Sequence, residues 1–360
     1  MPGGVDDPAA PSGGNTYDRR LCRELPRLGW QVHEHAVAGD WPQPRAAARA
    51  ELARILRESP DGSLVLLDGL VACGVPDIVV PEAGRLRLVV LMHLPLGAET
   101  GLAPLPAAAL DAAERRTLRA VAAVVATSDW AARSLVEHHG LDPGRVHVAV
   151  PGADIAPLAT GTASGPGGTP RLLCVASVTP RKGQDRLVPA LAEVADLPWS
   201  CVCVGALGQD PGYVARLREL IEKLGLGDRV ELAGPRSGDE LDASYAAADL
   251  LVLTSYAETY GMAVTEALAR GIPVLATAVG GVPEAVGQAP DDSVPGVLVP
   301  PQDPAALAPA LRHWLGDPGE RRRSRQAARA RRITLTGWET TARSLAGALE
   351  HLRRKPREAV

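Results

Sequence analysis

Hydrophobic residues fall into short aliphatic runs that alternate with longer stretches of helical periodicity. In the first half of the chain these runs cover residues 64–67, 88–92, 121–127 and 146–150. Parallel strands need a crossover connection, which is usually a helix, so this alternation is typical of a parallel sheet. The pattern predicts an α/β domain over residues 1–158.

Residues 159–170 interrupt this pattern, because they are rich in Gly, Thr, Ser and Pro and show no apolar periodicity. Such a composition predicts a linker. The alternation then resumes with strands expected at 171–177, 200–205, 229–233, 250–254 and 273–276, and with helices expected at 184–195, 211–224, 239–247 and 261–270. These elements predict a second α/β domain over residues 171–335.

The tail of the chain is predicted to contain two more helices, at residues 304–315 and 337–351. Its last segment, residues 336–360, is expected to form a C-terminal helix that packs back toward the N-terminal domain. Residues 312–332 are rich in arginine, which favours a solvated helix face over contact with an anionic membrane.

Each domain is expected to be a Rossmann-like, doubly wound parallel sheet. Ligands of open α/β sheets bind beyond the carboxyl ends of the strands. We therefore expect an active site in a cleft between the two domains.

Composition narrows the classes of function. A net charge of -4 and a pI near 6.1 argue against a protein that binds nucleic acid through its phosphate backbone. The five cysteines form no CxxC pair, so they fit neither a disulfide framework nor a zinc site and indicate reduced thiols. The chain has no run of about 18 apolar residues, and its first residues are not expected to act as a secretion signal. A cytoplasmic location is expected.

Two glutamates lie at a predicted junction between a strand and a helix. Glu258 precedes the turn, and Glu266 lies more than one turn inside the helix that Gly261 is expected to open. At this spacing the two carboxylates cannot share a proton, so we expect them to bind different hydroxyl-bearing parts of one extended ligand. The backbone N–H groups near Tyr260, Gly261 and Met262 favour a phosphate. The spacing alone is a weak signal, because surface glutamates on a helix produce it often.

Two adjacent cations strengthen this hypothesis. Arg181 and Lys182 follow the predicted strand at 171–177, and Lys182 is one of only three lysines in the chain. An arginine fork and a lysine point charge together suit a pyrophosphate. Their position at a strand end favours ligand binding over a basic loop that only caps a helix.

Two further features occupy similar positions. His93 ends the predicted strand at 88–92, at a carboxyl edge of the first sheet, although a single histidine is usually structural. Gly280 and Gly281 permit close approach of the backbone to a ligand, and a proline-led helical turn follows them.

These motifs resemble glycosyltransferase family 4, the retaining GT-B enzymes. The matching segments are residues 179–183 (TPRKG), 258–266 (ETYGMAVTE), 280–284 (GGVPE), 151–154 (PGAD) and 338–339 (WE). Weaker matches in the first half are Gly13-Gly14, Gly29-Trp30 and residues 128–130. The combination is specific, and it extends from about Pro11 to the last helix.

The resemblance implies a retaining hexosyltransferase that uses a nucleotide-diphosphate sugar, most often UDP-linked, and needs no metal or other cofactor. It implies that Arg181 and Lys182 bind the diphosphate, Glu258 the sugar hydroxyls and Glu266 the ribose. His93 would contact the sugar near the reacting carbon. Stabilising the charge that develops on the leaving phosphate lowers the barrier.

The remaining donor contacts are also implied by the resemblance. Gly13 and Gly14 would approach the phosphate and the acceptor from the first domain, and the base would lie near Gly234 and Arg236. The acceptor is not readable from the sequence. It is expected to be set by loops of the first domain such as residues 95–106, in which Glu99 is the one acid.

The chain departs from the family pattern in places. The family begins with a buried strand before the glycine loop, whereas here that loop lies close to Met1, so the first strand is expected to be missing. Tyr260 stands where Phe is frequent, and Gly152 where Asn is commoner. Asp291 and Asp292 lie in a polar loop and are expected to be solvated rather than to bind a metal.

Two other interpretations stay open. A nucleotide-sugar-binding protein without transferase activity would bind the donor but transfer no sugar. A phosphorylase of the same fold would release sugar with inorganic phosphate and no nucleotide. The pair of cations, which suits a pyrophosphate, speaks against the phosphorylase.

Overall fold

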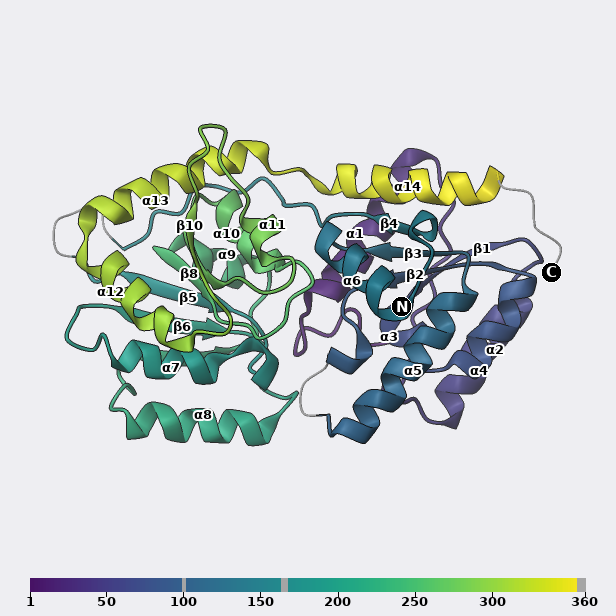
Figure 1. The fold of residues 1–360 in the computed structure, drawn as a ribbon, viewed down its shortest axis with the longest axis horizontal. Helices are drawn as coiled ribbons and strands as arrows, with labels where there is room; N and C mark the ends of the chain where they lie inside the picture. The colour runs from purple at the N-terminus through teal and green to yellow at the C-terminus, as the bar shows by residue number, and fades with distance from the viewer. Residues whose placement is uncertain (99–101, 163–167, 355–360) are drawn as a thin grey trace. The chain divides into compact units, whose positions relative to one another are not determined.

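The computed structural model describes residues 1–98, 102–162 and 168–354, and it divides the chain into two compact units (Figure 1). The N-terminal unit comprises Met1–Asp6, Gly13–Gly152 and the chain from Trp338 onward. The C-terminal unit comprises Asp7–Ser12 and Ala153–Gly337. Glu99 and residues 163–167 of the predicted linker lie outside the described residues.

The N-terminal unit contains a four-stranded parallel sheet of order β1-β2-β3-β4. Its strands are β1 (Leu64–Asp68), β2 (Arg87–Met92), β3 (Ala123–Ala126) and β4 (Val146–Val148). Asp68 pairs with Leu91, and Met92 pairs with Ala126. The residues that end or follow these strands therefore meet at one edge of the sheet.

Helices cover both sides of this sheet. They are α1 (Gly13–Glu24), α2 (Ala46–Glu58), α3 (Gly69–Ala72), α4 (Pro76–Val79), α5 (Pro104–Ala120), α6 (Asp129–His139) and α14 (Trp338–Arg354). Figure 1 shows α2, α4 and α5 on one side and α14 on the other. The sequence sets the ends of α6 clearly: Ser128 Oγ accepts the Ala131 N–H at 3.0 Å, and Gly140 ends the helix in the left-handed conformation.

The C-terminal unit contains a six-stranded parallel sheet of order β10-β9-β8-β5-β6-β7. The strands are β5 (Arg171–Val175), β6 (Ser200–Val204), β7 (Val230–Gly234), β8 (Leu250–Leu253), β9 (Val274–Thr277) and β10 (Gly296–Val299). The first strand of the unit, β5, lies in the middle. The chain adds β6 and β7 on one side and then β8, β9 and β10 on the other, so the winding direction reverses between β5 and β8.

The helices of this unit are α7 (Gln184–Ala192), α8 (Pro211–Lys223), α9 (Gly238–Ala246), α10 (Met262–Ala269), α11 (Val282–Val286), α12 (Leu307–Gly316) and α13 (Pro318–Arg331). Figure 1 shows α7 and α8 on one side of the sheet and α10 and α13 on the other. The core is dominated by aliphatic residues, with Leu172 of β5 and Val252 of β8 fully buried.

Short 3-10 turns complete both units. They are η1 (Leu25–Leu28), η2 (Val80–Gly84), η3 (Leu96–Ala98) and η4 (Pro143–Arg145) in the N-terminal unit, and η5 (Pro180–Lys182), η6 (Pro304–Ala306) and η7 (Arg332–Thr334) in the C-terminal unit.

The predicted pair of parallel-sheet α/β domains is confirmed, and the predicted strands and helices differ from the observed ones by a few residues at their ends. The predicted elements did not include β10. Its residues, Gly296–Val299, begin with a glycine, lie between two prolines and are mostly half-buried, so no run of buried aliphatic residues distinguishes them from a loop.

The chain leaves the N-terminal unit after Gly152, earlier than the predicted linker. Residues 159–162 of that linker all bond to the rest of the C-terminal unit; for example, Ala159 N–H donates to Arg270 C=O at 2.9 Å, and Thr162 Oγ1 donates to Asp249 Oδ2 at 2.5 Å. Asp249 is buried and also accepts the Arg171 N–H at 3.0 Å. A segment without apolar periodicity is thus fixed through polar contacts.

Arginines of the basic stretch also form specific contacts, which differs from the expected solvated face. Arg325 Nη2 donates to Asp249 Oδ1 at 2.6 Å, and Arg332 Nη2 donates to Ala156 C=O at 2.6 Å. Arg331 Nε donates to Val286 C=O at 3.0 Å. These residues fasten α13 and the turn after it to the C-terminal unit.

Other expectations can be compared directly. All five cysteines are free, as predicted, and four of them are buried. Residues near Met1 do not join the sheet as a strand; Pro2 forms an isolated parallel bridge with Val37. Among the described residues, none of the helices combines the length and the apolar character needed to cross a bilayer.

We predict that Leu88→Ala lowers the free energy of unfolding by about 2–5 kcal/mol, because Leu88 of β2 is fully buried and its truncation leaves a cavity. Leu105→Ala in α5 is the matched control, since that side chain is 85% exposed and should cost less than about 0.5 kcal/mol. Urea denaturation of both variants measures the difference. Equal losses would contradict the assigned core.

Candidate functional site

The reversal between β5 and β8 marks the place where doubly wound sheets bind ligands. The turn η5 follows β5 and carries Arg181 and Lys182, while the loop after β8 carries Glu258. The two segments are joined by a backbone bond, because Tyr256 N–H donates to Arg181 C=O at 2.8 Å. The topology thus brings together three residues that the sequence predicted separately.

These three side chains form one charged cluster. Lys182 Nζ donates to Glu258 Oε1 at 2.5 Å, and Arg181 Nη1 lies 3.9 Å from Glu258 Oε2. The Glu258 side chain is 9% exposed, and those of Arg181 and Lys182 are 15% and 16% exposed. Water screens such a partly buried cluster less than it screens a surface ion pair.

Neutral neighbours fix the position of Glu258. Ser255 Oγ donates to Glu258 Oε1 at 2.8 Å, and Gly281 N–H donates to the Glu258 backbone carbonyl at 3.1 Å. Burial alone would raise the pKa of Glu258, but the charges of Lys182 and Arg181, together with the hydrogen bonds, hold it below its ordinary value. Glu258 is therefore an acceptor of hydrogen bonds at neutral pH.

Close backbone packing fixes the basic turn. Gly183 has a φ of 69°, and a Cβ added there would lie 2.1 Å from the Thr254 carbonyl oxygen. Thr254 Oγ1 in turn donates to Gly183 C=O at 2.8 Å. Only glycine fits this conformation and this approach, so the residue after Lys182 anchors the turn to the end of β8.

Two cations and one carboxylate leave this cluster with a net positive charge. An anion with several oxygens, such as a diphosphate, would be attracted to the cations, and a hydroxyl would donate to the carboxylate. The N-terminus of α10 begins nearby in the sequence, after Gly261 in the left-handed conformation at φ 94°. Helix N-termini also favour negative charge.

Glu266 lies within α10 and makes contacts different from those of Glu258. Tyr245 OH donates to Glu266 Oε2 at 2.7 Å, and the Arg270 guanidinium lies over the Tyr245 ring. Burial raises the pKa of Glu266, and the hydrogen bond from Tyr245 and the charge of Arg270 oppose that effect. The prediction that the two glutamates do not share one proton agrees with their separate partners.

The remaining predicted residues of this unit lie beside α10 in the sequence or follow β7. Tyr260 is buried, which raises its pKa to about 12, and Met262 is the first residue of α10. Gly234 ends β7 with a φ of 80°, and Arg236 Nη1 donates to Ser244 Oγ at 2.9 Å. The roles predicted for these residues stay predictions.

His93 and the glycine pair belong to the N-terminal unit. Gly13 opens α1, and a Cβ added at Gly14 would lie 3.1 Å from His93 Cδ2. The His93 imidazole faces two aspartates, Asp18 of α1 and Asp68 at the end of β1. Gly14 and His93 thus lie close together within this unit, and the roles predicted for them stay predictions.

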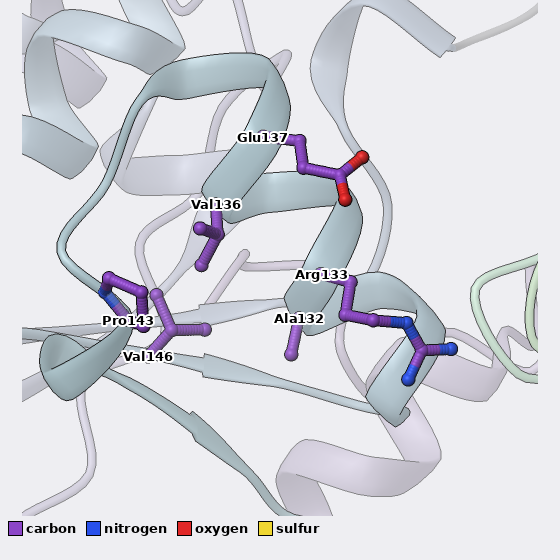
Figure 2. Close-up of a pocket in the computed structure, with 6 residues that line it drawn as sticks. All are labelled: Ala132, Arg133, Val136, Glu137, Pro143 and Val146. Carbon is purple, nitrogen blue, oxygen red and sulfur yellow. The ribbon is translucent and has the colours of Figure 1, made fainter.

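Two other features of the N-terminal unit deserve comparison with this site. A hollow beside α6 is lined mainly by Ala132, Val136, Pro143 and Val146, and Figure 2 shows Arg133 and Glu137 extending away from these side chains. Its walls lack the convergent polar groups of a catalytic pocket.

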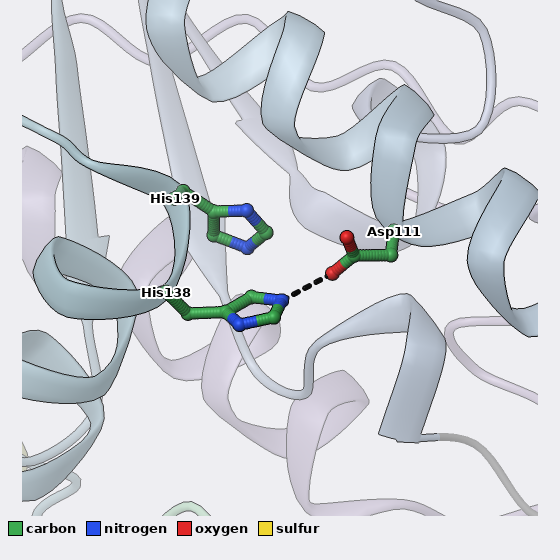
Figure 3. Close-up of side chains that lie close together, drawn as sticks. All are labelled: Asp111, His138 and His139. Atoms are coloured by element: carbon green, nitrogen blue, oxygen red, sulfur yellow. Dashed lines mark hydrogen bonds and ion pairs between the residues drawn. The ribbon is translucent and has the colours of Figure 1, made fainter.

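The second feature is a cluster of Asp111, His138 and His139 (Figure 3). An imidazole nitrogen of His138 bonds Asp111 directly, and His139 Nε2 lies 2.9 Å from Glu114 Oε1. Direct contact between imidazole and carboxylate is the arrangement of a hydrogen-bonded pair. We therefore assign no metal to it, nor to the His93 cluster.

Sequence reasoning missed the residues that support the site. Tyr245 and Asp18 make their contacts over long sequence distances, whereas Ser255 lies only three residues before its partner Glu258, and no motif marks any of the three. Asp68 could have been found, because it directly follows the aliphatic run at 64–67 as His93 follows the next run.

Two family patterns match the sequence and together cover most of it. The family described as Glycosyl transferases group 1 matches residues 163–331, and the family described as Glycosyltransferase Family 4 matches residues 11–156. The first match contains the Lys182 and Glu258 cluster, and the second contains His93.

Among curated relatives, the chain is similar to proteins named D-inositol 3-phosphate glycosyltransferase. The protein from Kineococcus radiotolerans is 36% identical over 261 residues, which are 67% of this chain and 60% of the relative. The protein from Streptomyces bingchenggensis is 32% identical over 288 residues, which are 74% of this chain and 61% of the relative. The matches thus span less than two thirds of these relatives.

Solved structures share the fold over nearly the whole chain. Sucrose-phosphate synthase from Thermosynechococcus elongatus has a TM-score of 0.76 at 25% identity, with 97% of each chain covered. HepE from Anabaena in complex with UDP-glucose has a TM-score of 0.73 at 20% identity, with 95% of this chain and 97% of HepE covered.

We predict that Gly183→Ala destabilises the protein more than Gly225→Ala. Both glycines have a positive φ, 69° and 67°, so alanine costs about 1–2 kcal/mol of backbone strain at either position. Only at Gly183 does the new Cβ meet backbone, which adds about 1–3 kcal/mol of overpacking; nothing lies within 4 Å at Gly225. Urea denaturation measures both. Equal losses would show that the contact with Thr254 is absent.

We also predict a pH dependence for Glu258→Gln. The lowered pKa of Glu258 means that its ionised form stabilises the fold above the unfolded-state pKa, and that this stability is lost as the pH falls through the folded-state pKa. The variant should therefore be less stable than the wild type at pH 7, and the gap should shrink in acid. Denaturation curves of both proteins at pH 7 and at acidic pH test this. A difference in the free energy of unfolding that does not change with pH would contradict it.

Proposed function

This chain belongs to glycosyltransferase family 4 and has the GT-B fold, and we propose that it transfers a hexose-type sugar from a nucleotide-diphosphate sugar to a hydroxyl acceptor. The observation that carries this proposal is the contact of Lys182 and Arg181 with Glu258. It lies between β5 and β8, where the winding of the C-terminal sheet reverses. These side chains supply cations for a diphosphate and an acceptor for sugar hydroxyls in one place.

Lys182 and Arg181 bind the diphosphate in this proposal, helped by the N-H groups near Gly261 and Met262. Glu258 accepts hydrogen bonds from the sugar hydroxyls. Because Lys182 bonds Glu258 directly in the structure, the diphosphate competes with Glu258 for the lysine, and a sugar hydroxyl can then replace the lysine as donor to the carboxylate.

The nucleoside extends away from this cluster in the proposal. Glu266 accepts a hydrogen bond from a ribose hydroxyl, and Gly234 and Arg236 lie near the base. Support comes from the position of Gly234 at the carboxyl end of β7 and from the left-handed backbone there, which leaves room for a flat ligand. The Tyr260 side chain is buried.

His93, Gly13 and Gly14 act from the N-terminal unit. His93 contacts the sugar near the reacting carbon, and the two glycines allow the backbone to approach phosphate and acceptor. That the ligand lies between the two units stays a prediction.

Catalysis in this proposal rests on charge. As the bond between the anomeric carbon and the phosphate oxygen breaks, negative charge grows on the leaving diphosphate, and Lys182 and Arg181 stabilise it most at that stage. We propose transfer with retention by attack on the same face, in which the leaving phosphate accepts the proton of the acceptor hydroxyl. The proposal includes no enzymic nucleophile and no metal.

A UDP-linked hexose is the proposed donor. HepE, which shares the fold, was solved with UDP-glucose. The acceptor named in the curated relatives, D-inositol 3-phosphate, is a candidate to be tested here.

We predict that Lys182→Ala lowers the transfer rate at limiting donor by roughly tenfold to a hundredfold, since losing a charged hydrogen bond costs about 1.5–3 kcal/mol. Lys223→Ala is the matched control, because Lys223 is exposed at the end of α8. Product formation is measured by mass spectrometry with a panel of nucleotide sugars and with acceptors that include D-inositol 3-phosphate.

Two outcomes would count against the proposal. Unchanged turnover in Lys182→Ala would remove the lysine from the donor site. Donor binding without transfer to any acceptor would favour a nucleotide-sugar-binding protein instead.

A further inference from the structure

Two buried aspartates surround His93 in the N-terminal unit. His93 Nε2 lies 2.9 Å from Asp18 Oδ1 and 4.0 Å from Asp68 Oδ2. Each aspartate side chain is 5% exposed, and that of His93 is 17% exposed. The three groups come from α1, from the end of β1 and from the residue after β2, so the fold rather than local sequence assembles them.

The geometry fixes the proton on one nitrogen. An ionised carboxylate only accepts hydrogen bonds, so the contact with Asp18 requires a proton on His93 Nε2. The ring is also held in place, because a Cβ at Gly14 would lie 3.1 Å from it and the Tyr17 ring meets it edge-on at 5.2 Å. Tyr17 OH in turn donates to Ala149 C=O at 2.7 Å.

The charges favour a second proton on the ring. If the imidazole were neutral, the cluster would hold two buried carboxylate charges close to one ring nitrogen and no positive charge. In the part of the chain that the structure describes, Asp18 Oδ2 is also buried without a hydrogen-bond partner. Buried charges are costly unless they are paired. A protonated imidazole pairs with both carboxylates.

The directions of the pKa shifts agree with this account. Burial alone would lower the pKa of His93, but the charge and hydrogen bond of Asp18 and the charge of Asp68 raise it above its ordinary value. Burial and the neighbouring Asp18 raise the pKa of Asp68 to about 6, and His93 opposes that rise. Asp68 also accepts the Leu70 N–H at 2.6 Å as the cap of α3.

We infer that Asp18 and Asp68 are positioning residues that hold His93 as a doubly protonated imidazolium with its Nε2–H directed at the carboxylates. The inference rests on the proposed function, in which His93 contacts the donor sugar. In that state Nδ1 also carries a proton, so it can only donate hydrogen bonds. The two aspartates would thereby determine which kind of group His93 can bind.

The test is an NMR titration of the full chain with 15N-labelled histidine, from pH 5 to pH 9, with His93→Gln used to assign the resonance. His93 should titrate above its ordinary value of about 6.5 and keep its Nε2 proton when neutral. Asp18→Asn should lower the pKa of His93 by about one unit or more, because an opposite charge at this distance shifts a pKa by roughly 1–3 units. Asp68→Asn should lower it less.

Asp111→Asn is the matched control, since Asp111 bonds His138 in the same unit and does not face His93 (Figure 3). It should leave the titration of His93 unchanged. A wild-type His93 that titrates at or below its ordinary value would overturn the inference, and this outcome does not depend on either aspartate variant. An Asp18→Asn variant with an unchanged His93 titration would overturn it as well.

Activity gives a second readout. The rate should decline as the pH rises through the His93 pKa, and Asp18→Asn should move that decline to lower pH by the shift seen in the NMR titration. Because the titration needs no donor, it separates the two proposals. If His93 titrates above its ordinary value and responds to Asp18→Asn as predicted, in a chain that transfers no sugar, the proposed function is rejected and the inference about His93 is retained.

Discussion

The ion pair between Lys182 and Glu258 is the interaction on which the rest of the account depends. It joins the segments that follow β5 and β8, the two strands between which the winding of the C-terminal sheet reverses, and it adds a side-chain bond to the backbone bond between Tyr256 and Arg181. Attraction to the Glu258 carboxylate stabilises the charged lysine, whereas its partial removal from water costs free energy. The arrangement leaves a positive charge at the edge of the sheet, and this charge gives the unit its capacity for a diphosphate.

Each unit places charged side chains at the carboxyl edge of a parallel sheet, but the balance of charge differs. Two cations and one carboxylate meet in the C-terminal unit, whereas two carboxylates meet one imidazole in the N-terminal unit. The first cluster attracts an anion. The second cluster keeps a cation on the ring of His93. Both depend on glycines, because Gly183 and Gly14 let backbone or ring approach closely.

The sequence carried enough information for the two sheets and for part of the site. Long alternating segments mark parallel sheets, and strand ends mark the edge at which Lys182, Glu258 and His93 lie. Contacts over long sequence distances were not predictable: Asp18 reaches His93 across 75 residues, and Asp249 fixes the segment near Thr162 across 87. The first domain was predicted to end at residue 158, but the chain leaves the N-terminal unit after Gly152. The polar contacts that fix the following segment leave no periodic pattern in the sequence. Strand β10 was missed because its residues begin with Gly296 and lie between Pro295 and Pro300, a composition typical of a loop.

The central claim is that Lys182, released from Glu258, holds a diphosphate. Calorimetric titration of the wild type and of Lys182→Ala with a nucleoside diphosphate and with its monophosphate tests it most directly. The account predicts that the wild type binds the diphosphate about tenfold or more tightly than the monophosphate, and that Lys182→Ala loses most of this preference. An undiminished preference in the variant would contradict it.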